Sequence, residues 1–298
     1  MRHIPLLLIL FPLMLRAQQD PLSTQFWNNY SHFNPGSMGL YYEHTASIMY
    51  RRQWESVNGA PESVHANYST LVKKNHGLGI NYIYDHVGFS ENHTANVNYN
   101  YQIMFDSYNE HILSFGVGIG LMHFSSYGDW IPPTTNEDPL IETATSPIVK
   151  PNFNTGIAYK KDYLYLGLGV THLFNFRKSD YSPAQHYYLM GDYTLRVNRE
   201  FSFVPRLIVQ TDAVKVNFDV SIMAILRKRY WLSAGYRYKD IITLSAGWNI
   251  LRKFKIGYSY DFSVGKLANF SNGTHEFVIG VQFGSREVHR PIQGNPNF

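Results

Sequence analysis

The sequence predicts an all-β fold, a transmembrane antiparallel β-barrel of about 14 strands with a periplasmic N-terminal segment. Three observations predict this fold. Apolar residues alternate with small or polar residues in one segment after another, as in strands with two unlike faces. An export signal precedes these segments, and no later stretch reaches the roughly 18 continuous apolar residues of a transmembrane helix. Short turns alternate with longer loops, which is typical of outer-membrane barrels.

The composition excludes several classes of protein. Charged residues make up 16% of the chain, against about 25% in an average soluble domain. Of 26 basic residues, Arg2 and Arg16 belong to the export signal, which leaves 24 against 22 acidic residues. A nucleic-acid partner is therefore not expected, because it would require a concentrated basic face. The absence of cysteine excludes disulfides and thiolate metal sites, and we expect no cofactor.

The N-terminus reads "MRHIPLLLILFPLMLRAQQD". A basic start, an apolar run from Ile4 to Leu15 and the small residue Ala17 predict a secretory signal peptide over 1–17. The apolar run is too short to serve as a membrane anchor.

The next segment, 18–44, is rich in aromatic residues, with Phe26, Trp27 and Phe33 among them. So many aromatics are not expected in a segment left free in solution. We expect it to fold against the periplasmic mouth of the barrel or into the lumen, or else to dock a periplasmic partner. The barrel itself is expected over 45–283, and 284–298 is expected to be a C-terminal periplasmic tail.

The alternation is clearest in "HILSFGVGIGLMHF", residues 111–124. Its G-x-G-x-G spacing is one residue short of a dinucleotide fingerprint, and no helical pattern follows it. Phe115, Val117 and Ile119 share one parity, whereas the glycines share the other. The stretch therefore predicts a strand with one apolar face and one face of small residues.

Similar segments recur to the end of the chain. The predicted strands are 45–52, 64–73, 77–85, 92–104, 110–124, 152–161, 163–174, 186–198, 200–210, 214–226, 229–238, 240–250, 254–261 and 274–283. Connections after even-numbered strands are short, and those after odd-numbered strands are generally longer. The short side is expected to be periplasmic and to carry both termini.

A secreted β-sandwich would also alternate. Its outer face would be rich in Lys and Glu, whereas here the second face carries Asn, Ser, Thr, Gly and Tyr. Aromatic residues also gather near strand ends, as the interfacial girdles of barrels require. These two features favour the membrane barrel over the sandwich.

Charged residues of both signs fall on the inward parity. Buried charges are costly unless they are paired, so mixed signs favour structural cross-links over the lining of a selective channel. The inward set comprises Asp85, Asp192, Arg196, Arg206, Lys215, Asp219, Arg237, Lys255, Asp261 and Glu276.

The chain has 13 histidines but neither H-E-x-x-H nor G-x-S-x-G. By register, His172 is expected to face lipid beside Val170 and Phe174, near the membrane interface. A catalytic pair with a serine on a neighbouring strand is a remote alternative, because no serine shares its parity in this strand. We therefore expect neither an enzyme nor a metal site.

Three N-terminal motifs resemble the PorP/SprF family, outer-membrane proteins of the type IX secretion system of Bacteroidota. They are "QQDPLSTQFWNNYSHFNPGSMG", "RRQWESVNGAPES" and "GLGINYIYDHVG". The family often has alanine and an aromatic residue after Asn-Pro, whereas this chain has "NPGSMG". The matching motif residues are Asn34, Pro35, Gly39, Arg52, Gln53, Trp54, Gly59, Ala60, Pro61, Asp85 and Gly88.

The resemblance implies a non-enzymatic barrel that supports export or surface attachment of a cargo protein such as a gliding adhesin. The implied partners are a secreted surface protein with a type IX C-terminal signal, and a periplasmic ring or peptidoglycan-binding lipoprotein of the system. Outer-membrane lipid would surround the barrel. The alternatives are a channel or hydrophobic-solute transporter and a lipid-modifying barrel enzyme.

The longest break in the alternation is 125–151, which is rich in Pro, Thr, Asp and Glu. It follows an odd-numbered strand, so we expect it outside the cell. An aromatic residue beside prolines in an exposed loop suggests recognition, although a loop that only shields the barrel mouth is an equal alternative. The expected contact residues are Asp129, Trp130, Ile131, Pro132 and Pro133.

Overall fold

The computed structural model describes residues 20–21, 23–106, 110–126, 147–174, 183–239, 241–264 and 271–286. Three short helices come first: η1 (Phe26–Asn28), α1 (Tyr30–Phe33) and η2 (Pro35–Ser37). Fifteen strand segments follow: β1 (Tyr42–Arg52), β2 (Glu62–Lys73), β3 (His76–Val87), β4 (Ser90–Met104), β5 (His111–Ser126), β6 (Ile148–Lys161), β7 (Leu164–Thr171), β8 (His186–Tyr193), β9 (Leu195–Arg196), β10 (Phe201–Thr211), β11 (Val216–Leu226), β12 (Tyr230–Arg237), β13 (Ile241–Ile250), β14 (Phe254–Ser263) and β15 (Thr274–Ser285). No helix among these residues is long and apolar enough to cross a membrane.

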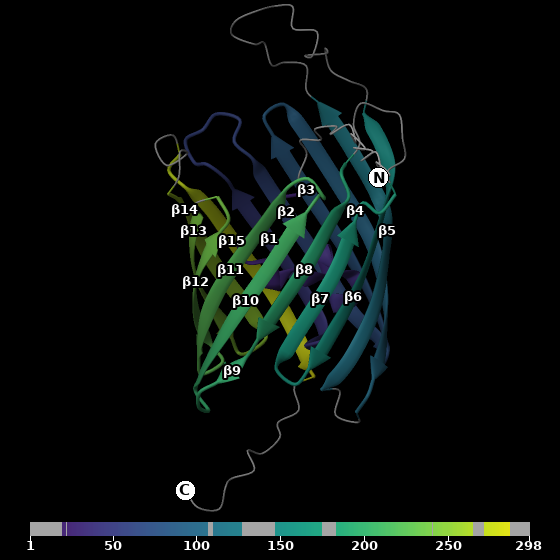
Figure 1. The fold of residues 1–298 in the computed structure, drawn as a ribbon, viewed down its shortest axis with the longest axis vertical. Helices are drawn as coiled ribbons and strands as arrows, with labels where there is room; N and C mark the ends of the chain where they lie inside the picture. The colour runs from purple at the N-terminus through teal and green to yellow at the C-terminus, as the bar shows by residue number, and fades with distance from the viewer. Residues whose placement is uncertain are drawn as a thin grey trace, which may run out of the picture.

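The strands form one closed antiparallel barrel (Figure 1). Each strand pairs with its neighbours in sequence, and β1 pairs with β15 in a register that runs from Tyr42 opposite Ser285 to Arg52 opposite His275. β8 and β9 both pair with β10 and share one position in the wall, so the barrel has 14 strands. This confirms the predicted antiparallel barrel of about 14 strands.

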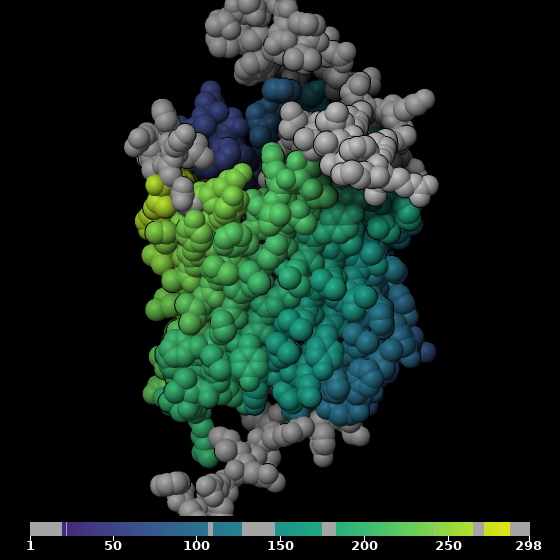
Figure 2. Space-filling model, in the orientation of Figure 1, coloured from purple at the N-terminus to yellow at the C-terminus, as the bar shows by residue number. Residues whose placement is uncertain are grey.

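The two faces of the wall differ as the alternation predicts. On β4, the outward side chain of Val97 is 56% exposed, whereas the inward Asn98 and Asn100 are fully buried. Val117 on β5 and Leu166 on β7 also point outward. Figure 2 shows this outer face as a continuous layer of side chains over the strands. In a bilayer, these apolar side chains meet lipid, and the closed hydrogen-bond ladder leaves no strand edge unpaired.

The two ends of the barrel carry different connections. At the short-turn end, β2–β3, β6–β7, β11–β12 and β13–β14 are joined by a few residues each, and β9 lies there, low in Figure 1. At the long-loop end, the connections β1–β2, β5–β6, β7–β8 and β14–β15 are longer, whereas β3–β4, β10–β11 and β12–β13 are also short. The predicted asymmetry is therefore present at four of the seven connections of this end.

Several predicted details differ from the structure. β1 begins at Tyr42, inside the segment assigned to the N-terminal region, and the predicted strand 186–198 is divided between β8 and β9 at Thr194. Two members of the expected inward set, Arg196 and Lys215, are exposed, because they lie at or beyond strand ends where the alternation no longer decides direction.

Residues 23–41, here called the plug, lie inside the barrel. The plug approaches the wall near Asp20, which bonds Thr171 and His172 at the long-loop end. It ends at the short-turn end, where the Leu40 carbonyl accepts a hydrogen bond from Lys160. The expectation that both termini share one end is wrong for these residues. The plug traverses the lumen, so its start and the end of β15 lie at opposite ends.

Candidate functional site in the barrel lumen

The Asn34-Pro35 motif fixes the plug to the wall. The Asn34 side chain accepts a hydrogen bond from the Gly36 amide at 2.9 Å and so caps η2, whose first residue is Pro35. Its Nδ2 donates to the Ile157 carbonyl of β6 at 2.9 Å. One buried side chain thus closes a turn and joins the plug to the barrel, since an asparagine both accepts and donates.

The inward glycines make room for this turn. A Cβ added to Gly116 would lie 2.2 Å from the Gly36 nitrogen, and one added to Gly156 would lie 2.0 Å from Oδ1 of Asn34. Such contacts are impossible without movement of the plug. The small face of the stretch 111–124 therefore has a packing reason that alternation alone does not provide.

Aromatic side chains of the plug form the core of the lumen. Phe26, Phe33 and Leu40 are each 1% exposed, and Tyr30 stacks on Tyr165 with ring centroids 4.7 Å apart. This cluster is completed by inward residues of the wall: Ile112, Ala158, Tyr165, Tyr188, Met190 and Ile208. The core of the protein therefore lies within the barrel, between plug and wall.

A buried charge cluster holds the start of the plug. Arg51 bonds Asp261 at 2.7 Å and Glu276 at 3.0 Å, and Arg237 bonds Asp219 at 2.9 Å and Asp261 at 3.0 Å. All five side chains are at most 6% exposed. The expected inward charges Asp219, Arg237, Asp261 and Glu276 are thus paired, as structural cross-links require.

The plug supplies the remaining partners of this cluster. The Thr24 hydroxyl donates to Asp261 at 2.7 Å and accepts from Arg51 and Arg237 at 2.8 and 3.0 Å. The backbone amides of Thr24 and Gln25 donate to Glu276 at 2.8 and 2.7 Å. Sequence reasoning missed Arg51, although its position two residues after Met49 places it on the inward parity.

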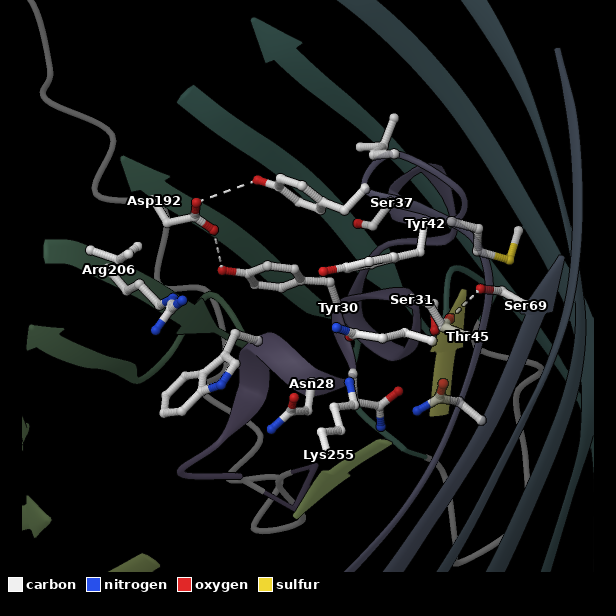
Figure 3. A pocket seen from close by; sticks show the side chains of 18 of the residues that line it. Asn28, Tyr30, Ser31, Ser37, Tyr42, Thr45, Ser69, Asp192, Arg206 and Lys255 are labelled. Carbon is white, nitrogen blue, oxygen red and sulfur yellow. Dashed lines mark hydrogen bonds between the residues drawn. The ribbon is translucent and has the colours of Figure 1, made fainter. Parts of the chain in front are cut away.

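A cavity of about 260 Å³ lies beside the plug (Figure 3). Asp192 of β8 accepts a hydrogen bond from Tyr30 at 2.7 Å, and a longer one of 3.4 Å from Tyr41. Burial and the neighbouring carboxylate raise the pKa of the Tyr30 and Tyr41 hydroxyls, so both remain donors. Arg206 lies over the Trp27 ring, 4.6 Å from its centroid. Polar and charged groups thus line much of this space.

A second cavity of about 470 Å³ lies at the short-turn end. Basic and acidic side chains line it together, including Lys161, Arg196 and Arg286 against Glu110 and Asp162. Tyr163, which also lines this cavity, is 40% exposed. This cavity faces the end that carries the short turns.

His172 is not directed at lipid, and that prediction is wrong. β7 ends at Thr171, and His172 adopts φ = 54°, which breaks the alternation and turns its side chain inward. It is 7% exposed and bonds Asp20 at 2.8 Å. Asp20, His172 and His186 place three potential ligand atoms within 4.8 Å of one another, so they could hold a metal ion.

Two further histidines meet where the plug contacts β2. His32 of α1 lies 5.4 Å from His65 of β2, measured between ring centroids, and is 4% exposed. Burial lowers the pKa of His32 to about 4. For Asp20, burial would raise the pKa, but the imidazoles of His172 and His186 hold it well below its usual range.

The remaining family-motif residues shape the long-loop end. Arg52 pairs with Glu55 and Glu62 at 3.2 and 3.4 Å at the surface. The Gln53 amide donates to the Pro61 carbonyl at 2.9 Å, and the Ala60 amide donates to Val57 at 3.3 Å.

The other motif positions lie on the loops and strands beside them. Trp54 adopts φ = 48°, and its amide donates to Thr274 at 3.2 Å. Gly59 and Gly88 both have positive φ, and the Gly88 amide donates to the Gly59 carbonyl at 2.9 Å, which joins two loops. Gly39 has φ = 70°, and Asp85 is half-buried on β3. The predicted contact residues Asp129, Trp130, Ile131, Pro132 and Pro133 lie outside the described residues.

Solved structures share this fold. The toluene transporter TodX of P. putida is 10% identical over 86% of this chain and 93% of that chain, with a TM-score of 0.53. Omp33 of Acinetobacter baumannii is 8% identical over 83% and 100% of the two chains, with a TM-score of 0.46. A Pseudomonas aeruginosa FadL homologue is 10% identical over 84% and 92%, with a TM-score of 0.47. No curated protein matches the chain.

The sequence model of one family spans most of the chain. It is described as "Type IX secretion system membrane protein PorP/SprF" and matches residues 15–281, which include the plug and nearly the whole barrel. The barrel fold and this family place the protein in the outer membrane. The family is one of secretion or transport and is not a known class of enzyme. The chain belongs to the PorP/SprF family of type IX secretion system membrane proteins.

Proposed function

We propose that this protein is a closed outer-membrane barrel of the type IX secretion system that supports export or surface attachment of a cargo protein. The observation that carries the proposal is the plug. A chain segment that crosses the lumen is packed by Phe26, Tyr30 and Phe33 and anchored by Asn34, and cavities of about 260 and 470 Å³ remain beside it among the described residues. A folded cargo could not pass through such a lumen, so its contacts would be made at the barrel ends.

The two ends would serve different partners. The loop 127–146 joins β5 to β6 at the long-loop end, and we propose that Asp129, Trp130, Ile131, Pro132 and Pro133 contact the cargo, a secreted surface protein with a type IX C-terminal signal. The short-turn end would face the periplasm and meet the ring or a peptidoglycan-binding lipoprotein of the system. Its mixed charges, including Lys161, Arg196 and Arg286, offer polar contacts for such a partner.

A hydrophobic-solute channel is the alternative function. Pockets for apolar solutes are lined mainly by hydrophobic side chains, whereas Asp192, Arg206 and Lys255 all line the cavity beside the plug. The lining therefore favours the proposed role in export or attachment of a cargo protein over transport of an apolar compound.

The test is a deletion of the gene, followed by quantification of the surface proteins of intact cells. Loss of one or a few type IX cargo proteins, restored by the wild-type gene, is expected. Trp130→Ala should lose the same cargo while the barrel still assembles, whereas Trp54→Ala in the β1–β2 connection at the same end of the barrel serves as a matched aromatic control. An unchanged surface proteome together with strong conductance of the purified barrel in a planar bilayer would refute the proposal and favour the channel.

A tag tests the orientation independently. An epitope inserted near Asn136 should be labelled on intact cells, because the loop is proposed to lie outside the cell. Labelling only after lysis would reverse the assignment of the two ends.

A further inference from the structure

Two buried imidazoles and one half-buried carboxylate meet just before the plug begins. Asp20 Oδ1 lies 2.8 Å from His172 Nε2, and Asp20 Oδ2 lies 3.7 Å from His186 Nδ1. The two imidazoles are 7% and 2% exposed, and the carboxylate is 14% exposed. Asp20 precedes the plug, whereas His172 and His186 follow β7 and begin β8, about 150 residues later in the chain.

The two ring nitrogens of His172 both face hydrogen-bond acceptors, which a neutral imidazole cannot satisfy with its single N–H. Asn152 Nδ2 donates to Asn96 Oδ1 at 2.8 Å, so Asn152 presents its oxygen to Nδ1 of His172, 2.8 Å away. Nδ1 must therefore carry a proton. Nε2 faces a carboxylate oxygen, which is also an acceptor. A neutral imidazole has only one N–H, so a cation is required between Nε2 and Asp20, either a second proton or a metal ion.

His186 has a nitrogen without a partner. Its Nδ1 lies 3.1 Å from the Ala184 carbonyl, and its Nε2 is buried with no hydrogen-bond partner among the described residues. Buried polar atoms are almost always paired in proteins, and an unpaired one calls for an explanation such as an ion. Because a carbonyl only accepts, Nδ1 carries the proton and Nε2 keeps a free lone pair, which a metal ion could take.

We infer that Asp20, His172 and His186 bind one divalent transition-metal cation of the Zn²⁺ class. Two imidazoles and a carboxylate are ligands that zinc accepts, and a water completes such three-residue sites. Asn152 on His172, together with Tyr188 and Thr171 on Asp20 at 2.7 and 3.0 Å, orients these ligands as outer partners do in metal sites. The metal would fasten the start of the plug to β7 and β8.

The test uses the full mature chain, purified from outer membranes with an affinity tag that contains no histidine. Zn²⁺ is titrated against the protein at pH 7 in competition with a chromophoric chelator, and Co²⁺ is added separately for its absorption spectrum. We expect about one equivalent of Zn²⁺ and a cobalt spectrum of nitrogen and oxygen ligands. Zinc should also slow amide exchange at Thr24 and Gln25, which follow the site in the plug.

Asp20→Asn and His186→Gln should each weaken Zn²⁺ binding by at least about tenfold. His93→Gln is the matched control, because His93 also contacts a carboxylate, Glu91, at 2.6 Å but belongs to no three-ligand group among the described residues. Heat-modified migration on gels verifies that each variant forms the barrel.

A wild-type protein that binds no stoichiometric Zn²⁺ would overturn the inference and leave an imidazolium–carboxylate ion pair. Binding that is unchanged in Asp20→Asn and His186→Gln, or lost equally in His93→Gln, would place the metal elsewhere and also overturn it. If the substitutions prevent assembly, the wild-type titration and the cobalt spectrum decide.

Discussion

Substituting Gly116 by alanine should dislodge the plug without disturbing the barrel wall. A Cβ at this position would lie 2.2 Å from the Gly36 nitrogen and 2.3 Å from the Pro35 carbonyl carbon. The nearest atoms belong to backbone, which cannot rotate aside as a flexible side chain can. An ordinary van der Waals contact begins near 3.4 Å, so the plug backbone would have to move by about 1.2 Å, the difference between 3.4 and 2.2 Å.

The size of the effect follows from the energetics of overpacking. Forcing extra volume into a well-packed core costs about 1–3 kcal/mol. An energy of that size shifts an equilibrium about 5- to 150-fold, here between the docked and the displaced plug. Because Asn34 caps η2 and bonds Ile157 in the same turn, displacement at Gly36 should also weaken that anchor.

The assay is conductance of the purified protein in a planar bilayer, together with limited proteolysis of the plug. Gly116→Ala should raise the open fraction and expose residues 23–41 to protease. Gly191→Ala is the matched control, because its Cβ would meet nothing closer than 3.3 Å, at the end of the Leu166 side chain. A Gly116→Ala protein as silent and as protease-resistant as Gly191→Ala would refute the reasoning.

Three further predictions concern the wall, the charge cluster and pH. Val117→Arg should block assembly, because a charge facing hydrocarbon costs about 2–4 kcal/mol. Ser245→Thr on the inner face should assemble normally, as measured by the heat-modified form on gels. Equal loss of that form in both variants would mean that the strand register is wrong. Arg51→Met should lower the free energy of unfolding in urea titrations by about 3–5 kcal/mol, since it leaves buried carboxylates without their ion-pair partner. Arg52→Met, at the exposed neighbouring residue, should lower it by about 0–1 kcal/mol. Similar urea midpoints for the two variants would contradict the buried cluster. Because the pKa of His32 falls from 6.5 to about 4 in the docked plug, its contribution to docking is complete above pH 6.5 and is lost as the pH falls towards 4. Conductance should therefore rise on acidification in the wild type, and His32→Gln should reduce that dependence; an unchanged dependence would exclude His32 as its origin.

The strand pattern could be predicted because lipid imposes one rule at every outward position. Val97, Val117 and Leu166 must be apolar whatever lies inside, so the period of two is readable without knowledge of the lumen. The inward glycines could not be interpreted in the same way. Gly116 and Gly156 are small because a distant segment, Asn34 to Gly36, lies against them, and a single sequence does not show which segment fills a barrel.

The direction of the site residues could not be predicted from the sequence either. His172 follows the parity of β7 in sequence, yet its left-handed backbone at the strand end turns it inward to Asp20, 152 residues away. Alternation predicts direction only while a residue remains in the hydrogen-bonded ladder. The paired signs of Asp219, Arg237 and Asp261 could be predicted as cross-links, but the role of Thr24 could not, because its partners come from four separate strands.

The charge cluster couples closure of the barrel to docking of the plug. Arg51 of β1 lies directly opposite Glu276 of β15 in the seam that closes the barrel, and their side chains are 3.0 Å apart. The same Glu276 carboxylate accepts the backbone amides of Thr24 and Gln25. Before β15 pairs with β1, these amides lack their acceptor and Arg51 lacks one of its two anions. Each event therefore stabilises the other, because a buried charge is costly until all of its partners are in place. The N-terminal end of the plug is therefore fully fastened only when the last strand is in place, and closure of the seam and docking of the plug are coupled in free energy.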